Sequence, residues 1–237
     1  MSDLNNKTAY ITGGSKGIGY GIAKALLDAG MRVAISSRNI EVARAAAASL
    51  SVDPARVLAL ESDVSSMEAE VNAVKAVTEH FGGLDVLIAN AGVGHFSPID
   101  QLSETDWKQT IDTNLTGVFN SVKSSINALK QSKGYIITIA SLAGANFFET
   151  ASAYNASKFG LVGFSQAIML DLRKYDIKVT TIMPGSVATY FNNHVPNEAD
   201  GWKIQPEDIG QLVADLLRMN PRTLPSKIEV RPSKPGK

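Results

Sequence analysis

Short apolar runs alternate with segments of helical periodicity along almost the whole chain. Runs such as 86–89 and 135–139 lack polar alternation, which predicts strands that are buried on both faces. A shorter run at 228–230 predicts a last strand. Strands that alternate with helices are typical of a parallel sheet covered by helices on both sides. The six longer runs are residues 8–12, 32–36, 57–61, 86–89, 135–139 and 178–183.

The segments between the runs carry apolar side chains every three or four residues, which predicts amphipathic helices. Within 67–81, this spacing predicts a buried face made of Met67, Val71, Val74, Val77 and Phe81. A capping box at 103–106 predicts the start of another helix. One side of that helix carries Trp107, Ile111, Leu115, Val118 and Val122. Further helices are predicted at 17–29, 40–50, 151–175 and from residue 206.

This pattern predicts an α/β fold with a doubly wound parallel sheet of about seven strands. The chain has 237 residues and no internal linker, so we expect residues 1–237 to form one domain. Residues 232–237 are expected to form a flexible tail. Ligands of such sheets bind at the carboxyl ends of the strands.

Composition excludes several classes of function. Lys plus Arg and Asp plus Glu both number 23, so a basic nucleic-acid-binding protein is not expected. The absence of Cys excludes disulfides and thiolate metal sites. No apolar run reaches ~18 residues, so no membrane span is expected. The start of the chain has no signal-peptide pattern, and we therefore expect a cytoplasmic protein.

A glycine-rich turn, Thr12-Gly-Gly-Ser-Lys-Gly-Ile-Gly19, joins the first strand to the first helix. Glycine allows positive φ and close approach of the backbone to a ligand. The following helix N-terminus offers free N–H groups and partial positive charge, which suits a dinucleotide pyrophosphate in a Rossmann-type fold. The spacing is G-x-x-x-G-x-G rather than the commoner G-x-G-x-x-G.

Two other interpretations of this turn are open. Residues 13–17 also spell G-x-S-x-G, the nucleophile elbow of hydrolases, with Ser15 as the nucleophile. That chemistry needs a partner histidine, for which His95 and His194 are the later candidates. The turn could equally be an ordinary glycine-rich connection.

Seven motifs in order resemble the short-chain dehydrogenase/reductase family in its compact single-domain form. The first is the glycine turn at 12–19, and the others span the chain as far as Thr189. A lone Tyr-x-x-x-Lys motif is weak evidence, but seven motifs on the expected elements are specific. The remaining six are Asp63-Val64, Asn90-Ala91-Gly92, Asn114, Ser141, Tyr154-x-x-x-Lys158, and Pro184-Gly185 with Thr189.

Three of these residues suit carbonyl chemistry. Tyr154 and Lys158 are four residues apart and share one helix face, and Ser141 follows a strand that ends at the ligand edge. A lysine cation about 4–5 Å away supplies ~3–4 kcal/mol, enough to bring the tyrosine pKa from near 10 toward about 7. We therefore expect Tyr154 to act as general acid or base and Ser141 to bind the carbonyl oxygen.

The resemblance also implies supporting roles. Asn114 would hold a water molecule that links Lys158 to solvent, although Asn114 could instead be a solvent-facing helix residue. Asp63 would contact adenine, unless it only caps the next helix. Lys158 would also bind the nicotinamide ribose. The implied cofactor-binding residues are Gly13, Ser15, Lys16, Gly17, Ile18, Gly19, Arg38, Asp63, Val64, Asn90, Ala91, Gly92, Tyr154, Lys158, Pro184, Gly185, Val187 and Thr189.

The end of the second strand predicts NADP rather than NAD. NAD-specific sites place a carboxylate about 20 residues after the glycines. That position holds Ser37 here, and Arg38 follows it. Arg38 can pair with a 2′-phosphate, and Lys16 adds a second cation. The alternative is that both are ordinary surface charges.

The loops beside the motifs predict the substrate class. They carry His95, Leu142, Phe148 and Tyr190 and offer no Arg or Lys to hold an anion, so we expect a small uncharged ketone or aldehyde. The segment 187–202 is short for a lid, and the chain lacks the terminal Gly-Gly of many keto-acyl reductases. A 3-oxoacyl reductase and a non-catalytic NADP-binding sensor remain alternatives. The resemblance implies a homodimer or homotetramer.

Overall fold

The computed structural model describes residues 3–234 and contains one parallel sheet. Its strands are β1 (Thr8–Ile11), β2 (Arg32–Ser37), β3 (Val57–Glu61), β4 (Val86–Ala89), β5 (Tyr135–Ile139), β6 (Lys178–Pro184) and β7 (Lys227–Val230). Their order across the sheet is β3-β2-β1-β4-β5-β6-β7. The order reverses between β1 and β4, where such sheets bind ligands. The predicted doubly wound sheet is confirmed.

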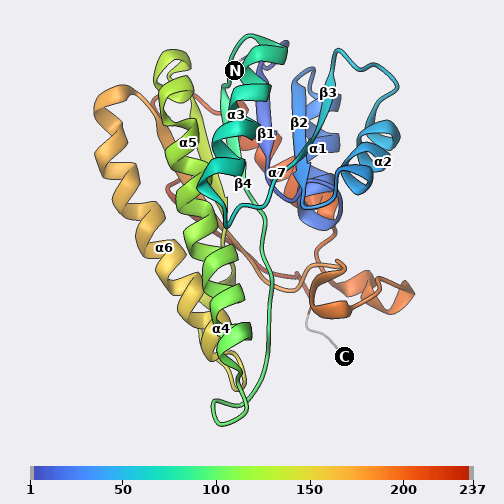
Figure 1. The fold of residues 1–237 in the computed structure, drawn as a ribbon, viewed down its shortest axis with the longest axis vertical. Helices are drawn as coiled ribbons and strands as arrows, with labels where there is room; N and C mark the ends of the chain where they lie inside the picture. Colours follow the sequence, from blue (N-terminus) through green and yellow to red (C-terminus); the bar gives the residue numbers. More distant parts are fainter. Residues whose placement is uncertain (1–2, 235–237) are drawn as a thin grey trace.

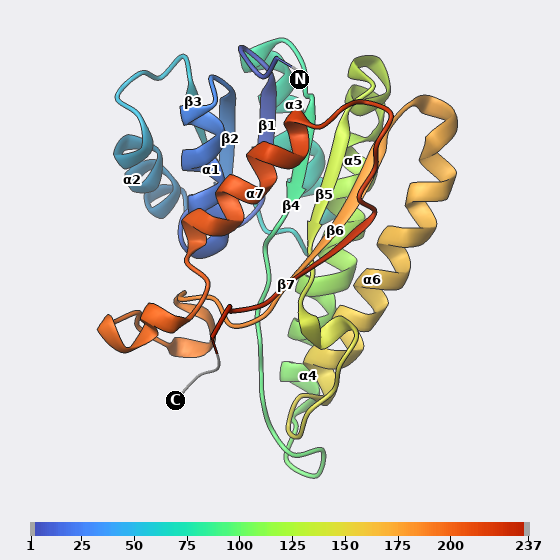
Figure 2. The ribbon, with the colours of Figure 1, turned by 180° about the vertical axis from the view of Figure 1, so that it is seen from behind.

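Helices cover both faces of the sheet (Figures 1 and 2). Helices α1, α2 and α7 lie on one face, and α3, α5 and α6 lie on the other. Among the described residues, no helix is long and apolar enough to cross a membrane. The helices are α1 (Gly17–Asp28), α2 (Ile40–Leu50), α3 (Met67–Phe81), α4 (Glu104–Ile111), α5 (Gly117–Ser132), α6 (Ser152–Leu172) and α7 (Pro206–Arg218).

Burial explains why the strands lack polar alternation. Residues of β1, β4 and β5 are buried without exception, because each of these central strands faces a helix layer on both sides. The edge strand β7 instead alternates between exposed and half-buried residues. The central strands therefore form a rigid platform, and their carboxyl ends carry the loops described below.

Helix α3 differs from its predicted orientation. Met67 and Val71 were predicted to be buried, but they are 36% and 47% exposed. Glu70 is fully buried in their place, together with Ala73. Val74, Val77 and Phe81 are buried as predicted, so the spacing was wrong only at the first two positions. There Glu70 turns inward, because it finds hydrogen-bond donors inside the protein.

The predicted helix after residue 103 is interrupted by a π-helical turn, Asp112–Thr116, between α4 and α5. The extra residue of this wider turn changes the face that the helix presents. Val118 and Val122 are buried as expected, whereas Trp107 is 40% exposed. Asn114 lies inside the turn and is fully buried, so it is not a solvent-facing helix residue.

Candidate active site

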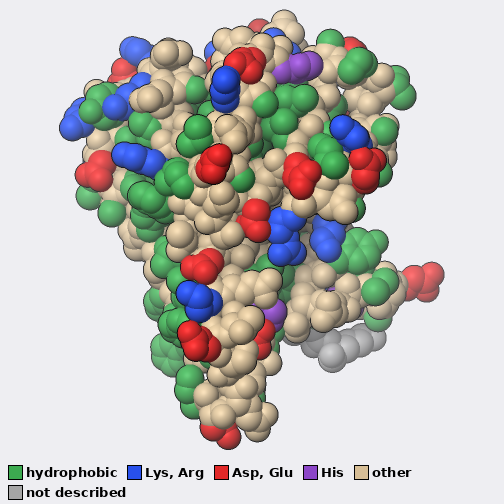
Figure 3. Space-filling view, viewed as in Figure 1, with side chains coloured by type: hydrophobic (Ala, Val, Ile, Leu, Met, Phe, Trp, Pro, Cys, Tyr) green, Lys and Arg blue, Asp and Glu red, His purple; other side chains and the backbone are tan. Residues whose placement is uncertain are grey.

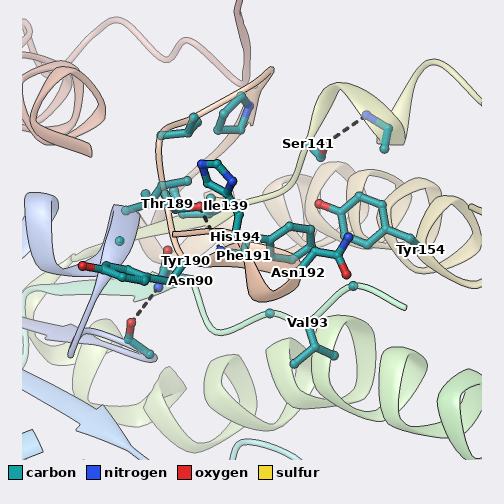
Figure 4. Close-up of a pocket in the computed structure, with 18 of the residues that line it drawn as sticks. Asn90, Val93, Ile139, Ser141, Tyr154, Thr189, Tyr190, Phe191, Asn192 and His194 are labelled. Atoms are coloured by element: carbon teal, nitrogen blue, oxygen red, sulfur yellow. Dashed lines mark hydrogen bonds between the residues drawn. The ribbon is translucent and has the colours of Figure 1, made fainter. Parts of the chain in front are cut away.

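A cleft of about 1300 Å³ lies at the carboxyl ends of the strands. Its walls come from the loops that follow β1 to β6 and from the chain around residues 186–194. Most small-molecule pockets measure roughly 300–1,000 Å³. The cleft therefore has room for an extended ligand and a second small molecule together. Figure 4 shows the part of this cleft around Tyr154.

The glycine turn forms one wall of the cleft. Gly13 and Gly17 have φ values of 64° and 56°, which other residues rarely adopt. Lys16 is the N-cap of α1 but makes no side-chain capping bond, whereas Asn39 and Ser66 cap α2 and α3. The first N–H groups of α1 thus remain available beside the cleft, together with the positive end of the helix dipole.

Asn90 ties the end of β4 to this turn. Its Nδ2 donates to the carbonyl oxygens of Thr12 at 2.9 Å and Gly13 at 3.1 Å. The Thr12 hydroxyl in turn accepts the N–H groups of Asn90 and Ala91. Gly19 makes this arrangement possible, because a Cβ atom there would lie 2.5 Å from Asn90 Nδ2. Gly19 is thus buried behind the turn and does not line the cleft.

Ser141, Tyr154 and Lys158 meet in the same cleft. Ser141 follows β5 and caps a short 3₁₀ turn, with its Oγ accepting the Ala143 N–H at 3.1 Å. Tyr154 and Lys158 lie one turn apart on α6, and Lys158 Nζ is 5.7 Å from the centre of the tyrosine ring. Figure 4 shows the Tyr154 hydroxyl directed toward Ser141. The α6 spacing and the end of β5 together produce this convergence.

Burial controls the protonation of both α6 residues. Lys158 is 4% exposed and donates to the carbonyl oxygen of Ile139 at 3.1 Å. Burial lowers the pKa of Lys158 from near 10.5 to about 8. Burial also raises the pKa of Tyr154, and Ser141 offsets part of this rise. A lowered tyrosine pKa was predicted from the sequence because the desolvation of the phenolate was left out. In the folded protein, this desolvation is the largest effect on the pKa of Tyr154.

Asn114 holds the loop after β4. Its Oδ1 accepts the Val93 N–H at 2.8 Å, and its Nδ2 donates to the Val93 carbonyl oxygen at 2.8 Å and to Ser157 Oγ at 3.0 Å. The side chain therefore does not line the cleft. Asn114 supports the loop from behind the cleft wall. It packs close to Gly92, where a Cβ atom would lie 3.3 Å from Asn114 Oδ1 and 3.7 Å from Lys158 Nζ.

Exposed cations occupy the opposite end of the cleft. Lys16 and Arg38 are solvent-exposed and both line it, together with Ser37. Glu41, the nearest acidic residue in the sequence, pairs with Arg44 at 2.8 Å instead of facing Arg38. Figure 3 shows acidic and basic side chains interspersed over the face it displays, without a large area of one sign.

Asp63 also lies at this end. Its Oδ1 accepts the Ser65 N–H at 2.9 Å and the Ser65 hydroxyl at 2.7 Å. Ser66, rather than Asp63, is the N-cap of α3. The simple capping interpretation of Asp63 is therefore wrong.

Aromatic rings form the wall around Tyr154. Phe96 lies 5.4 Å from the tyrosine ring centre and 6.1 Å from Phe148. Phe191 lies 5.5 Å from Tyr154 and 6.2 Å from Phe96. A methyl group on Gly94 would overlap the Phe191 ring. Rings from three separate loops thus pack beside the tyrosine, and sequence spacing alone could not show that Phe191 reaches Gly94.

The segment that carries Phe191 is closed at its base by a bridge between Val187 and Ile204. We call residues 187–204 the lid segment. Near its end, Asp200 accepts hydrogen bonds from His194 Nε2 and Lys203 Nζ. Lys203 and then His194 hold the pKa of the Asp200 carboxyl well below its usual range. The lid segment is therefore pinned by its own polar residues, although it is short.

Neither histidine supports the hydrolase interpretation. His194 is bonded to Asp200, and His95 Nδ1 lies 3.3 Å from Asp106. Within residues 3–234, Ser15 makes no hydrogen bond to either ring. The nucleophile, base and acid of a hydrolase are thus not brought together.

Of the residues predicted from the sequence, only Gly19 and Asn114 lie outside the cleft wall. Within the predicted tail, Pro232, Ser233 and Lys234 line the cleft, and the flexibility of the tail stays a prediction. Pro232 lies beside Gly185, where a Cβ atom would be 3.2 Å from Pro232 Cδ. Residues 235–237 lie outside the described residues. The spacing of apolar residues in the sequence did not indicate that the end of the chain comes back to the cleft.

Comparisons with known proteins agree with this geometry. The sequence profile of the short chain dehydrogenase family matches residues 7–200. An uncharacterized oxidoreductase of Staphylococcus aureus strain MW2 is 33% identical over 98% of this chain and all of its own length. A glycine betaine reductase of Emericella nidulans is 30% identical over 97% of this chain, which spans only 19% of that relative.

Solved structures show the same fold around bound cofactor. An alcohol dehydrogenase from the archaeon Thermococcus sibiricus, complexed with 5-hydroxy-NADP, gives a TM-score of 0.90 at 29% identity, covering 96% of this chain and 97% of that one. A short chain dehydrogenase from Burkholderia cenocepacia in complex with NADP gives 0.88 at 29%, covering 97% and 98%. The chain is a member of the short chain dehydrogenase family and an oxidoreductase of that type.

Proposed function

We propose that the protein interconverts a small uncharged ketone or aldehyde and its alcohol, using NADP(H). The observation that carries this proposal is the convergence of Ser141, Tyr154 and Lys158 on one cleft with an aromatic wall. A sensor that only binds the cofactor has no need of this convergence.

The cleft suits NADP(H) at its outer end. The uncapped start of α1 and the open backbone at Gly17 would hold the pyrophosphate, since a Cβ atom at Gly17 would meet only Thr189. Arg38 and Lys16 would pair with the 2′-phosphate, and Asp63 would contact adenine. The NADP derivatives bound by the two solved relatives support this choice, with NAD as the weaker alternative.

When bound, the reduced cofactor supplies a hydride to the carbonyl carbon. Tyr154 donates its hydroxyl proton to the carbonyl oxygen, while Ser141 donates a hydrogen bond to the same oxygen. Lys158 stabilises the tyrosinate that remains and holds the nicotinamide ribose. In alcohol oxidation, Tyr154 takes the proton back. Asn114 fixes the loop beside Lys158, and we retain the prediction that it holds a water molecule linking Lys158 to solvent.

The wall composition supports a neutral substrate. Phe96 and Phe191 pack against the reactive tyrosine and Phe148 stacks on Phe96, while Leu142, Tyr190 and His95 extend the surface. Lys203, Arg231 and Lys234 also line the cleft, but Lys203 pairs with Asp200 at 2.6 Å and Arg231 pairs with Glu229 at 3.0 Å. Apolar contact distinguishes substrates weakly, by ~1–3 kcal/mol per methylene. We therefore expect several ketones and aldehydes to be accepted. A carrier-bound 3-oxoacyl substrate is the alternative.

We further propose that two copies associate through the outer face of α5 and α6. Phe119, Phe159 and Leu170 are 43–59% exposed there, and Phe119 forms an edge contact with Phe164 across the two helices. Large exposed apolar groups on adjacent helices are typical of interaction surfaces. Sedimentation of the wild type should show a dimer or tetramer, and Leu170→Glu with Phe119→Ser should halve the assembly, to a monomer or a dimer respectively.

The test of the reaction is NADPH oxidation with a panel of neutral ketones and aldehydes, a 3-oxoacyl thioester and a keto acid. Tyr154→Phe is the matched control, because the ring still packs while the transferable proton is lost. We expect neutral carbonyls to be reduced by the wild type and turnover to be lost in Tyr154→Phe, with NADPH binding retained. Turnover of the thioester or keto acid alone would show that the substrate class is wrong. NADPH binding without any turnover would favour a sensor.

A further inference from the structure

The mechanism above leaves one buried carboxylate unused. Glu70 of α3 is fully buried among apolar residues of its own helix and of the sheet. Its Oε1 accepts hydrogen bonds from the Tyr10 hydroxyl at 3.0 Å and from Ser62 Oγ at 2.6 Å. Its Oε2 is buried and has no hydrogen-bond partner within residues 3–234. A carboxylate in such surroundings is costly, so its presence calls for a physical reason.

The hydrogen bonds of Glu70 continue across three strands. The Tyr10 hydroxyl also lies 3.2 Å from Ser36 Oγ. The resulting polar chain runs Ser36–Tyr10–Glu70–Ser62, and all four side chains are buried. Tyr10 belongs to β1, Ser36 lies near the end of β2, and Ser62 directly follows β3. One glutamate thus connects the carboxyl ends of β2 and β3 through β1.

The backbone groups of Ser36 and Ser62 form hydrogen bonds to segments that line the cleft. The Ser36 carbonyl oxygen accepts the N–H of Gly14 in the glycine turn at 3.1 Å. The Ser62 N–H donates to the Ser37 carbonyl oxygen at 3.0 Å. Ser37 precedes Arg38, and Ser62 precedes Asp63. Tyr10, Ser36 and Glu70 therefore lie beneath the three segments that would hold the adenosine and its phosphates, and Ser62 brings the polar chain to the cleft wall.

We propose that Glu70 is a positioning residue for the adenosine 2′-phosphate half of the NADP(H) site. This inference rests on the proposed cofactor. Glu70 does not touch the cofactor. It fixes the spacing of the glycine turn, Arg38 and Asp63 by holding Tyr10 and Ser62 in one hydrogen-bonded arrangement. Apolar residues of similar size would fill the same space without an unpartnered oxygen, so packing alone does not account for the network.

The experiment removes the buried part of the network, with Tyr10→Phe, Ser36→Ala and Glu70→Met combined, and leaves Ser62 in place because it lines the cleft. Replacing these buried partners by apolar groups is expected to leave the thermal midpoint unchanged or higher. The affinities for NADPH and for the fragment 2′,5′-ADP, measured by calorimetry without substrate, should nevertheless fall at least about tenfold. The kcat at saturating NADPH should be unchanged, because Ser141, Tyr154 and Lys158 lie at the other end of the cleft.

Two single variants sharpen the result. Glu70→Gln keeps an acceptor for both hydroxyls, so its NADPH affinity should stay near that of the wild type. Tyr135→Phe is the control for lost stability, because it removes a buried hydroxyl contact to Thr180 at 2.8 Å in β5, away from the cleft. It should lower the thermal midpoint without changing NADPH affinity.

Wild-type affinity for both ligands in the combined variant would overturn the inference. Loss of affinity only in proportion to lost stability would also overturn it, because the role would then be structural. Absence of NADPH binding by the wild type is a separate outcome, which contradicts the proposed cofactor instead.

Discussion

The two ends of the cleft use positive charge in opposite ways. At the reacting end, Lys158 is enclosed by the protein and donates to the Ile139 carbonyl oxygen. At the outer end, Lys16 is exposed and lies 5.9 Å from the Tyr190 ring centre. The same side chain type is therefore desolvated in one place and hydrated in the other. Burial lowers the pKa of Lys158 to about 8. Lys16 is exposed to solvent and is not buried in this way.

This contrast separates catalysis from recognition. A buried cation interacts strongly with its neighbours because little water screens it, so a small change there alters the chemistry. An exposed cation contributes less per contact and is weakened by salt. We therefore expect substitutions at the reacting end to have larger effects than those at the outer end.

Among the substitutions that test this contrast between the two ends, Lys158→Met should have the largest effect on turnover. Loss of the cation removes the stabilisation of the tyrosinate, and we expect kcat to fall by at least about a hundredfold, the lower range for general acid–base assistance. NADPH affinity should fall as well, because Lys158 would hold the ribose. Stopped-flow kinetics and calorimetry measure the two quantities separately. Normal cofactor affinity in this variant would contradict the ribose contact.

The same substitution should change how stability depends on pH. Relative to the unfolded chain, the folded protein disfavours the protonated form of Lys158, since its pKa is about 8 in the fold and near 10.5 when exposed. The unfolded chain thus binds more protons between these values, and the stability of the wild type rises with pH there. Relative to Lys158→Met, the wild type should gain about 2–3 kcal/mol between pH 7 and pH 10. Urea unfolding at each pH measures this difference, and a constant difference would show that Lys158 is not desolvated.

Sequence patterns predicted the reacting end better than its supports. The doubly wound parallel sheet was expected from the buried runs, and the shared helix face of Tyr154 and Lys158 from their four-residue spacing. Glu70 could not be recognised, because an acidic residue in an amphipathic helix normally faces water. The π-helical turn at Asn114 was missed as well. Its one extra residue changes the face of the helix in the fold, but the apolar residues in the sequence still recur every three or four positions. The Phe191 contact with Gly94 depends on loop geometry, which no periodicity records.

At the outer end, Arg38→Asp should shift preference from NADPH toward NADH. The change removes a cation from the 2′-phosphate and offers a carboxylate to a 2′-hydroxyl. A charge-assisted hydrogen bond contributes ~1.5–3 kcal/mol, so NADPH affinity should fall by roughly one to two powers of ten. Added salt should weaken NADPH binding to the wild type more than NADH binding. Equal affinity of the wild type for both cofactors would contradict the assignment of Arg38.

The smallest effect is expected where neither charge acts, at the contact between Gly94 and Phe191. Gly94→Ala should push the Phe191 ring away from the Tyr154 wall, because the added methyl group overlaps that ring. Phe191→Ala should enlarge the same wall. Both changes should alter the ranking of ketones by size by about tenfold in kcat/KM, within the usual range for apolar contacts, and leave the smallest ketone little affected.

Combining the two substitutions sharpens this test. Once Phe191 is reduced to alanine, the methyl group at residue 94 meets only the edge of the Phe96 ring, at 2.8 Å, so Gly94→Ala should add less than it does in the wild type. A double-mutant cycle on kcat/KM for a small and a bulky ketone measures this coupling. Phe147→Ala is the matched control, since that phenylalanine is 84% exposed and does not line the cleft. Additive effects of the two substitutions, or an equal change in the control, would show that Phe191 does not shape the substrate wall.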